Sequence, residues 1–181
     1  MRGERMNEKK LVQKAKKQNK KALLQLVMQQ KDDYYRLAYS YMKNPHGAMD
    51  IMEEMIIILY EKIGQLEKIE SFYSWSKTIL VNLCKTKLKK QHKELLVDDI
   101  ELHSSTTQTT DPYKYKAETM DIEQLLSSLN PYQAETIKLK YLHDLDNATI
   151  AKITNVSVGT VKSRIHNGLN LLKRVYGRHD V

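Results

Sequence analysis

The chain has 181 residues, one cysteine, six glycines, three prolines and a formal net charge of +8. One cysteine excludes a disulfide framework and a cysteine-based zinc cluster, and so few glycines and prolines disfavour a turn-rich β-sandwich or barrel. The excess of basic residues favours a polyanionic partner, most often nucleic acid, although a lysine-rich surface without such a partner fits the charge equally well.

Apolar residues recur at helical spacing through the first half of the chain. One pattern runs from Leu11 to Val27 and a second from Tyr34 to Met42, where Asn44-Pro45-His46-Gly47 interrupts it. A third runs from Met49 to Ile63, and a short polar connection then leads to a fourth helix. These patterns predict an amino-terminal helical bundle.

The middle of the chain differs in charge and composition. From Glu94 to Tyr113 there is no lysine or arginine, and the stretch holds a run of serines and threonines, Ser104 to Thr110. Such a segment has no periodic apolar face and is typical of a flexible connector. We expect an acidic, polar linker over 94–118, which can span at most about 80 Å because an extended residue covers about 3.3 Å.

Four further helical patterns follow the expected linker. They lie at 122–129, 131–142, 148–153 and 158–172, and Thr154-Asn155-Val156 forms a tight turn before the last of them. No segment alternates polar and apolar residues over a strand's length. The sequence therefore predicts an all-α protein with two small helical domains, an amino-terminal bundle and a carboxy-terminal helix-turn-helix, joined by a flexible linker.

The last two helices have the layout of a DNA-binding helix-turn-helix. The apolar stripe of the final helix leaves polar and basic side chains outward or flanking, and no acid interrupts them. Side chains of these types contact phosphates and base edges. The alternative is an ordinary amphipathic helix with a solvated polar face. The outward or flanking residues are Thr160, Lys162, Ser163, Arg164, His166 and Asn167.

The run from Gly159 to His166, GTVKSRIH, closely resembles the hallmark of the fourth conserved region of bacterial sigma factors, and Leu129-Asn130-Pro131 resembles its lead-in. The resemblance implies that the last helix binds the −35 promoter element. By position, Lys162, Ser163, His166 and Asn167 would face the bases, while Thr160 and Arg164 would contact phosphates. One departure is Asn167-Gly168, which stands where the family usually has arginine-alanine.

Segments of the first half resemble the second conserved region of the same family. They are Tyr35 to Tyr41, Ala48 to Glu54, and Ser71 to Trp75. A chain with only these two regions resembles the extracytoplasmic-function (group IV) sigma factors. The resemblance implies region 2 at 7–93, region 4 at 119–177, and a chain that directs core RNA polymerase to promoters.

The segment from Met55 to Tyr60 is apolar all round. Either the helix is packed on both sides within its domain, or one side meets a partner. The resemblance implies docking on the clamp of the polymerase largest subunit, while the carboxy-terminal module meets the flap of the second-largest subunit. The expected polymerase-binding residues are Asp50, Met52, Glu53, Glu54, Ile56 and Ile57.

The connection from Gly64 to Ser71 resembles the loop that captures a base flipped from the −10 element. Phe72 and Trp75 are expected mainly in the core that supports it. Positive charge near the loop and along the following helix would serve the melting strand, although a solvated helix end is the alternative. The expected −10 residues are Lys68, Lys77, Asn82, Lys85, Lys89 and Lys90.

Catalytic and cofactor motifs do not occur in the sequence. There is no His-x-x-x-His, no Cys-x-x-Cys and no glycine-rich phosphate loop, so we expect no intrinsic catalysis, cofactor or metal. An apolar signal stretch is also lacking, which predicts a cytoplasmic protein without direct membrane insertion. The resemblance further implies an anti-sigma factor, which could be membrane-bound. The alternatives are a stand-alone helix-turn-helix regulator and a sigma-like interaction protein without promoter binding.

Overall fold

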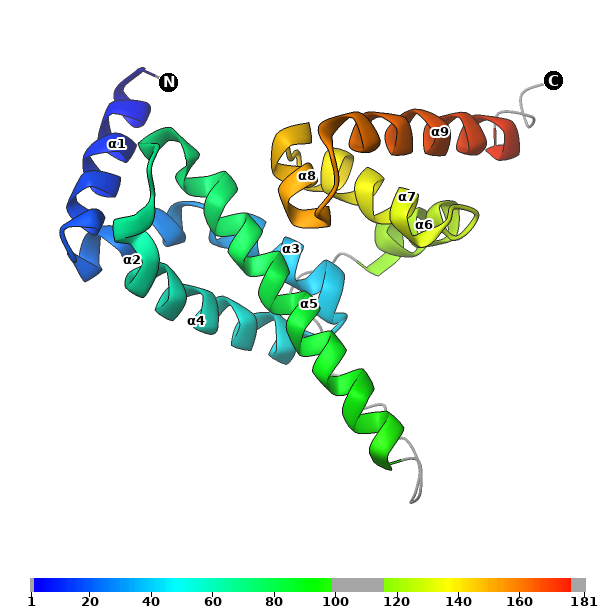
Figure 1. Cartoon of the computed structure of the whole chain (residues 1–181), viewed down its shortest axis with the longest axis horizontal. Helices are drawn as coiled ribbons and strands as arrows, with labels where there is room; N and C mark the ends of the chain where they lie inside the picture. Colours follow the sequence, from blue (N-terminus) through cyan, green and yellow to red (C-terminus); the bar gives the residue numbers. More distant parts are fainter. Residues whose placement is uncertain (1, 99–115, 177–181) are drawn as a thin grey trace. The chain divides into compact units, whose positions relative to one another are not determined.

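The computed structural model describes residues 2–98 and 116–176, with side chains at 7–94 and 122–176. Within these ranges helices are the regular structure and strands are absent (Figure 1). The chain divides into two compact units, Met1–Thr110 and Asp111–Val181. The predicted all-α class with two helical domains is confirmed.

The amino-terminal unit contains five α-helices and two short 3₁₀ turns among its described residues. The elements are α1 (Arg2–Lys16), α2 (Lys20–Gln29), α3 (Lys31–Met42), α4 (Pro45–Lys62), η1 (Ile63–Gln65), η2 (Ile69–Ser71) and α5 (Phe72–Asp98).

The single pattern predicted from Leu11 to Val27 is two helices. Gln18 takes a left-handed conformation with φ of 65° after α1. The side chain of Asn19 then caps α2 by accepting a hydrogen bond from the amide of Ala22 at 3.0 Å. Apolar spacing continues across this break, which is why periodicity alone joined the two helices.

The predicted interruption at Asn44 ends one helix and begins the next. Lys43 closes α3 in the left-handed region with φ of 58°. The Oδ1 atom of Asn44 accepts from the amide of Gly47 at 2.6 Å, and Pro45 occupies the first helical position, where its missing amide hydrogen costs nothing. Helix α4 therefore begins four residues before the predicted Met49.

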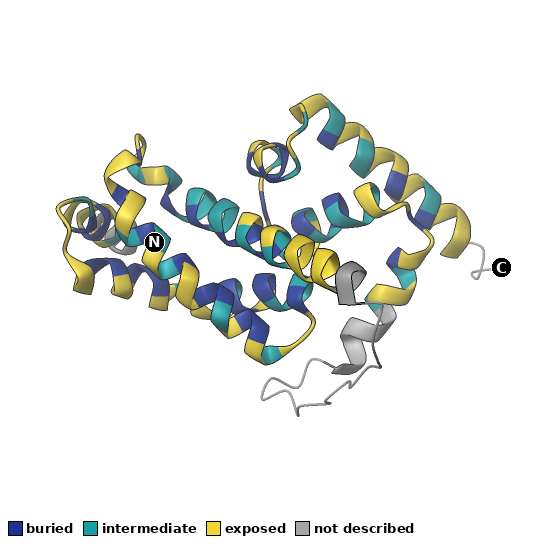
Figure 2. Cartoon of the chain, turned by 60° about the horizontal axis from the view of Figure 1, so that its bottom comes forward, coloured by how far each residue is buried: buried dark blue, intermediate teal, exposed yellow. Residues whose placement is uncertain are grey.

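The core of this unit lies where α3, α4 and α5 pack together (Figure 2). Leu37, Ile51, Met55, Leu59 and Leu80 are fully buried there. Cys84 is buried too, and desolvation raises the pKa of its thiol to about 12. Cys84 is thus the small core side chain that the sequence suggested.

A buried polar contact joins α3 to α5. The hydroxyl groups of Tyr34 and Ser76 lie 2.6 Å apart, and both side chains are fully buried. Burial raises the pKa of the Tyr34 hydroxyl, because desolvation disfavours its charged form. Because a buried hydroxyl is costly without a partner, this pair fixes the register of the two helices.

Replacing Ser76 by alanine should lower the free energy of unfolding by about 1–3 kcal/mol, since the Tyr34 hydroxyl loses its partner. Adding Tyr34→Phe removes the stranded hydroxyl and should restore part of that loss. Urea unfolding of both variants measures the difference. Equal stability of the single and double variants would show that the Tyr34 hydroxyl finds another partner.

The carboxy-terminal unit is a series of short helices followed by a long one. Its described elements are α6 (Lys116–Ser127), α7 (Pro131–Ile137), the π-helical turn η3 (Lys138–Leu142), α8 (Asn147–Thr154) and α9 (Val158–Tyr176). The predicted helix at 131–142 is present, but its second part is wound as a π-helix.

The ends of the expected linker are helical. Helix α5 continues through Asp98 and α6 begins at Lys116, so both enter the range 94–118. Residues 99–115, which carry most of the expected linker, lie outside the described residues. Across the described ranges, no helix is long and apolar enough to cross a membrane.

Candidate nucleic-acid interface

Helices α8 and α9 form a capped helix-turn-helix. Asn155 ends α8 in the left-handed region with φ of 53°, which turns the chain sharply. The Ser157 hydroxyl then caps α9 by accepting from the amide of Thr160 at 3.0 Å. The predicted turn at Thr154-Asn155-Val156 is present, and Ser157 caps the helix that follows it.

The start of α8 is held by Asp146 and Thr149. The Asp146 carboxylate accepts from the Thr149 amide at 2.9 Å and from its hydroxyl at 2.7 Å. Burial acts to raise the pKa of Asp146, but these hydrogen bonds and neighbouring backbone amides hold it below its usual value. Thr149 therefore secures the start of α8 by local hydrogen bonds.

The polar face of α9 carries four of the six predicted −35 residues. Lys162, Ser163, His166 and Asn167 are exposed on one side of the helix, opposite the buried Val161. Asn170 joins them one turn beyond His166, and the two side chains lie 2.9 Å apart, from Nδ2 to Nε2. The sequence analysis missed Asn170, although its spacing from His166 places it on the same face.

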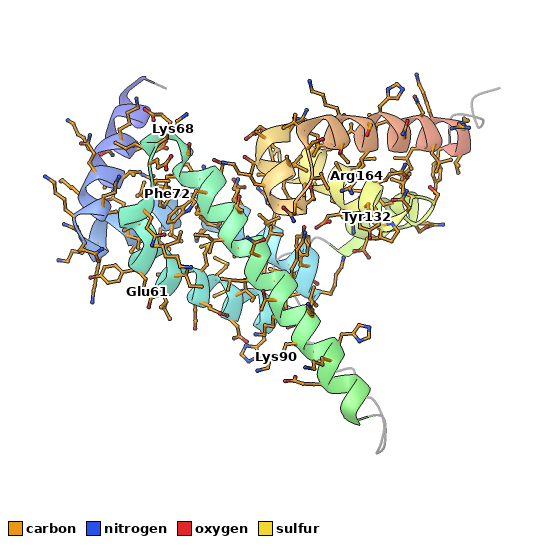
Figure 3. The ribbon with its side chains drawn as sticks, viewed as in Figure 1. Glu61, Lys68, Phe72, Lys90, Tyr132 and Arg164 are labelled. Carbon is orange, nitrogen blue, oxygen red and sulfur yellow. The ribbon has the colours of Figure 1, made fainter. Side chains whose placement is uncertain are left out.

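Thr160 and Arg164 lie along one edge of that face and are already engaged. The Thr160 hydroxyl is 2.9 Å from that of Ser157. The Arg164 guanidinium stacks over the ring of Tyr132 on α7, 5.0 Å from its centroid (Figure 3). Tyr132 thus orients Arg164, which the sequence could not show because it needs the packing of α7 on α9.

Gly168 lies where α9 packs on α7. It is buried, and a Cβ atom added there would lie 2.6 Å from Cδ1 of Ile137 and 3.5 Å from Cβ of Gln133. Real Cβ contacts are never so short, so alanine at this position requires Ile137 to move. Asn167-Gly168 was noted as a departure from the family pattern. Its glycine lies on the face of α9 opposite the predicted base-facing residues, where the close packing of Ile137 leaves little room for a side chain.

A double-mutant cycle tests this contact. Gly168→Ala gains helix propensity of about 1 kcal/mol but overpacks Ile137, so we expect little or no stabilisation. In an Ile137→Val background, which lacks Cδ1, the same change should stabilise the unit by about 1 kcal/mol. Thermal unfolding measures both steps. An identical effect of Gly168→Ala in the two backgrounds would contradict the contact.

The outer face of α5 gathers most of the predicted −10 residues. Asn82, Lys89 and Lys90 are exposed and Lys85 is half-buried, and helical geometry places Asn82, Lys85 and Lys89 along one side. Lys90 lies beside Glu94, with Nζ and Oε1 3.8 Å apart. The side of α5 that bears Asn82, Lys85 and Lys89 therefore carries positive charge towards the carboxyl end of the helix.

Lys77 does not share that face. Its side chain is only 13% exposed, and its Nζ lies 3.8 Å from Oδ2 of Asp33 on α3. On a regular helix it lies about 140° round the axis from Asn82. The prediction grouped Lys77 with the strand-facing lysines because charge alone does not reveal the direction of a side chain.

The predicted loop lies between α4 and α5. Lys68 is exposed on it (Figure 3), while Phe72 immediately after it is fully buried. The rings of Phe72 and Trp75 lie 6.4 Å apart, and Trp75 keeps partial exposure. Phe72 is therefore a core residue, as expected. Trp75 packs beside it at the edge of the core, with its side chain partly exposed.

Helix α4 separates the six predicted polymerase-binding residues into inward and outward groups. Met52 is only 9% exposed, whereas Ile57 is 60% exposed. Glu53 and Glu54 are exposed, and Ile56 is half-buried. The all-round apolar segment is thus buried on one side, through Met55 and Leu59, and open on the other.

Asp50 is held within the unit. Its Oδ2 atom accepts from Lys87 on α5 at 3.0 Å, and His46 Nδ1 lies 3.4 Å from Oδ1. The hydrogen bond from Lys87 keeps the pKa of Asp50 below its usual value. Asp50 therefore links α4 to α5, and it is not a freely exposed charge at the edge of α4.

Two exposed apolar residues on α2 were missed by the sequence analysis. Leu24 is 49% exposed and Met28 53% exposed, one helical turn apart. Helix α2 packs on α4, where Lys20 Nζ lies 5.1 Å from the centroid of the Tyr60 ring. The spacing of Leu24 and Met28 on α2 was visible in the sequence, but the exposure of their side chains was not.

Models of two protein regions match the chain. Residues 26–94 match the model described as Sigma-70 region 2, and residues 119–172 match Sigma-70, region 4. The first covers α3, α4, the loop and most of α5. The second covers the helix-turn-helix with the helices before it.

Curated relatives match over nearly the whole chain. RNA polymerase sigma factor SigV of Bacillus subtilis (strain 168) is 34% identical over 168 residues, covering 92% of this chain and 98% of the relative. ECF RNA polymerase sigma factor SigW of the same organism is 28% identical over 177 residues, covering 92% and 95%.

Solved structures share the fold. The sigma factor RpoE, in complex with the anti-sigma factor NepR from Bartonella quintana, aligns with a TM-score of 0.67 and 22% identity, covering 87% of this chain and 97% of that chain. CnrH, in complex with the cytosolic domain of CnrY, aligns with a TM-score of 0.67 and 16% identity, covering 96% and 99%.

Proposed function

The chain belongs to the extracytoplasmic-function group of the sigma-70 family and is a promoter-directing sigma factor, and we propose that it does this by gripping two promoter elements while bound to core RNA polymerase. One observation carries the proposal. A single chain holds both region 2 and region 4, and the polar face of α9 in region 4 carries no acid. A stand-alone helix-turn-helix regulator is excluded, because it has no need of region 2.

In this proposal α9 enters the major groove of the −35 element. Lys162, Ser163, His166 and Asn167 provide donors and acceptors on one exposed face, which is the geometry that base-edge contacts require. His166 and Asn170 are hydrogen-bonded, so they act as one polar unit. Arg164, stacked on Tyr132, reaches the phosphates at the edge of the groove.

The loop between α4 and α5, together with α5 itself, binds the −10 element. Lys68 supplies positive charge beside the loop, and Asn82, Lys85, Lys89 and Lys90 follow along α5 towards the duplex. A captured base needs an unstacked nucleotide and nearby positive charge, and these lysines supply that charge. Lys77 pairs with Asp33 and is largely buried, so we expect it to contribute less to DNA-strand binding than the sequence suggested.

The open side of α4 docks on the clamp of the largest polymerase subunit, and the carboxy-terminal unit meets the flap of the second-largest. Ile57 is the exposed apolar anchor, with Ile56 beside it and Glu53 and Glu54 as the charged rim. Met52 packs into the core, and Asp50 pairs with Lys87 on α5. Catalysis belongs to the polymerase, and the chain contributes recognition and strand opening.

Further partners and the cellular place follow from family membership. We propose that an anti-sigma protein sequesters the chain in the cytoplasm, where core polymerase is found. Two solved structures that share this fold are complexes, RpoE with the anti-sigma factor NepR and CnrH with the cytosolic domain of CnrY. These complexes suggest the class of partner, while the likeness itself shows the fold alone.

Run-off transcription tests the proposal. Core polymerase is mixed with the purified chain and with fragmented genomic DNA from the source cell, and the 5′ ends of the transcripts are mapped. We expect discrete start sites that depend on the chain, each preceded by two shared sequence elements. Absence of chain-dependent initiation on all fragments, with a folded chain, would overturn the proposal.

A further inference from the structure

The loop between α4 and α5 is anchored inward and open outward. Ile63 is fully buried and Leu66 is 4% exposed, so both apolar side chains point into the unit. Glu67 and Lys68 between the two 3₁₀ turns are exposed. Leu66 has extended backbone, with φ of −67° and ψ of 110°, and separates η1 from η2. The shape of the loop therefore depends on what holds Leu66.

Helix α1 packs on both turns of this loop (Figure 1). Leu11, Val12 and Ala15 are buried on its inner face. At the end of α1, the Lys16 ammonium donates to the backbone carbonyl of Leu66 at 2.5 Å. Two helical turns earlier, Lys9 Nζ lies 2.8 Å from Oε1 of Glu70. The helix thus holds the loop at both ends of the segment 66–70.

The two contacts differ in strength. Lys9 and Glu70 are 54% and 65% exposed, and ion pairs in that setting contribute little because water screens them. The Lys16 hydrogen bond is partly buried and charge-assisted, which makes it the stronger of the two. Lys16 therefore makes the stronger of the two polar contacts from α1 to the segment 66–70.

We propose that Lys16 is a positioning residue, through which α1 holds the loop in the shape that receives the flipped −10 base. This inference rests on the proposed function of the loop. The matched region 2 model begins at residue 26, so α1 lies before it and its role is not given by that match. Without the brace, the Leu66 carbonyl loses its charged donor and the loop samples other shapes, which weakens binding of the captured strand.

The experiment compares Lys16→Met, which removes the donor, with Lys16→Arg, which keeps one. Lys17→Met is the matched control, because Lys17 is the neighbouring exposed lysine and its loss removes the same charge. Holoenzyme is assembled with each variant. Its affinity is measured for a single-stranded oligonucleotide carrying the non-template −10 strand of a start site mapped by run-off transcription. Amide hydrogen exchange at 64–71 is measured on the chain.

We expect Lys16→Met to weaken oligonucleotide binding about fivefold to tenfold and to speed exchange at 64–71, while exchange in α3 is unchanged. Lys16→Arg should restore both, and Lys17→Met should resemble the wild type. If Lys16→Met does not fold, Lys16→Gln, which keeps a polar tip with shorter reach, replaces it in the same two measurements.

Equal losses in Lys16→Met and Lys17→Met would overturn the inference, since the charge alone would then explain the effect. Unchanged exchange at 64–71 in Lys16→Met would overturn it as well. The failure of the wild-type holoenzyme to initiate or to bind the strand would instead refute the proposed function. The two failures are therefore distinguishable.

Discussion

Replacing Ile57 by glutamate should weaken binding of the chain to core RNA polymerase at least tenfold. Ile57 is 60% exposed on the open side of α4, so the change places a charge at the centre of the proposed interface without disturbing the core. Truncating a hot-spot residue at the centre of an interface costs about 2 kcal/mol or more, and about 1.4 kcal/mol corresponds to tenfold in the dissociation constant. Titration of labelled chain with core polymerase measures the dissociation constant.

The control for Ile57→Glu is Leu88→Glu, which puts the same charge on a partly exposed apolar residue of α5. Both variants should keep the circular dichroism of the wild type, and only Ile57→Glu should lose affinity. Met52 is unsuited to this test, since at 9% exposure a glutamate there would destabilise the fold. Wild-type affinity of a folded Ile57→Glu variant would place the polymerase contact elsewhere.

Replacing Lys162 by alanine should cost roughly 1–3 kcal/mol of binding at the cognate −35 element, or about fivefold to 150-fold. Lys162 is exposed on the face of α9 that bears the other base-facing candidates. Promoter DNA with the native upstream element and DNA with that element scrambled are compared, with holoenzyme, at one salt concentration.

The loss on the native element should exceed the loss on the scrambled one, because a base contact exists only in the first. Lys173, which is exposed in the last turn of α9, provides the control variant Lys173→Ala. An equal loss for Lys162→Ala on both DNAs would show that Lys162 contacts phosphate alone.

The helices were predictable because each buries one face. Leu37, Ile51, Leu59 and Val161 recur at helical spacing in the sequence and are fully buried in the structure. The caps at Asn44 and Asn19 act within three residues of their partners, so they are local too, although the sequence analysis noted only a break at Asn44 and neither cap. Periodicity and capping thus account for the fold class and the order of the elements.

The parts that could not be predicted depend on contacts between distant residues. Asp50 and Lys87 are separated by 37 positions, yet their pairing links α4 to α5. The same holds for Lys16 and Leu66, 50 positions apart, which meet only when α1 packs on the loop. A linear pattern gives the charge and hydrophobicity of each residue but not its partner.

Gly168 and η3 illustrate a second limit, that of backbone detail. From the sequence, a glycine within a helix is expected only to destabilise that helix. The structure explains Gly168, because Ile137 lies too close for a larger side chain. The segment Lys138–Leu142 continues the helical apolar spacing of α7, so its π-helical winding has no separate signal in the sequence. In the structure η3 packs on α8, and Gly168 of α9 packs on α7, and neither contact can be read from a linear pattern.

DNase I footprinting of polymerase bound to this chain, at a mapped start site, tests most directly that the two units grip one promoter together. The account predicts two protected segments more than one helical turn apart, the upstream one lost in Lys162→Ala and the downstream one retained. A single protected segment, or the loss of both segments together in that variant, would contradict it.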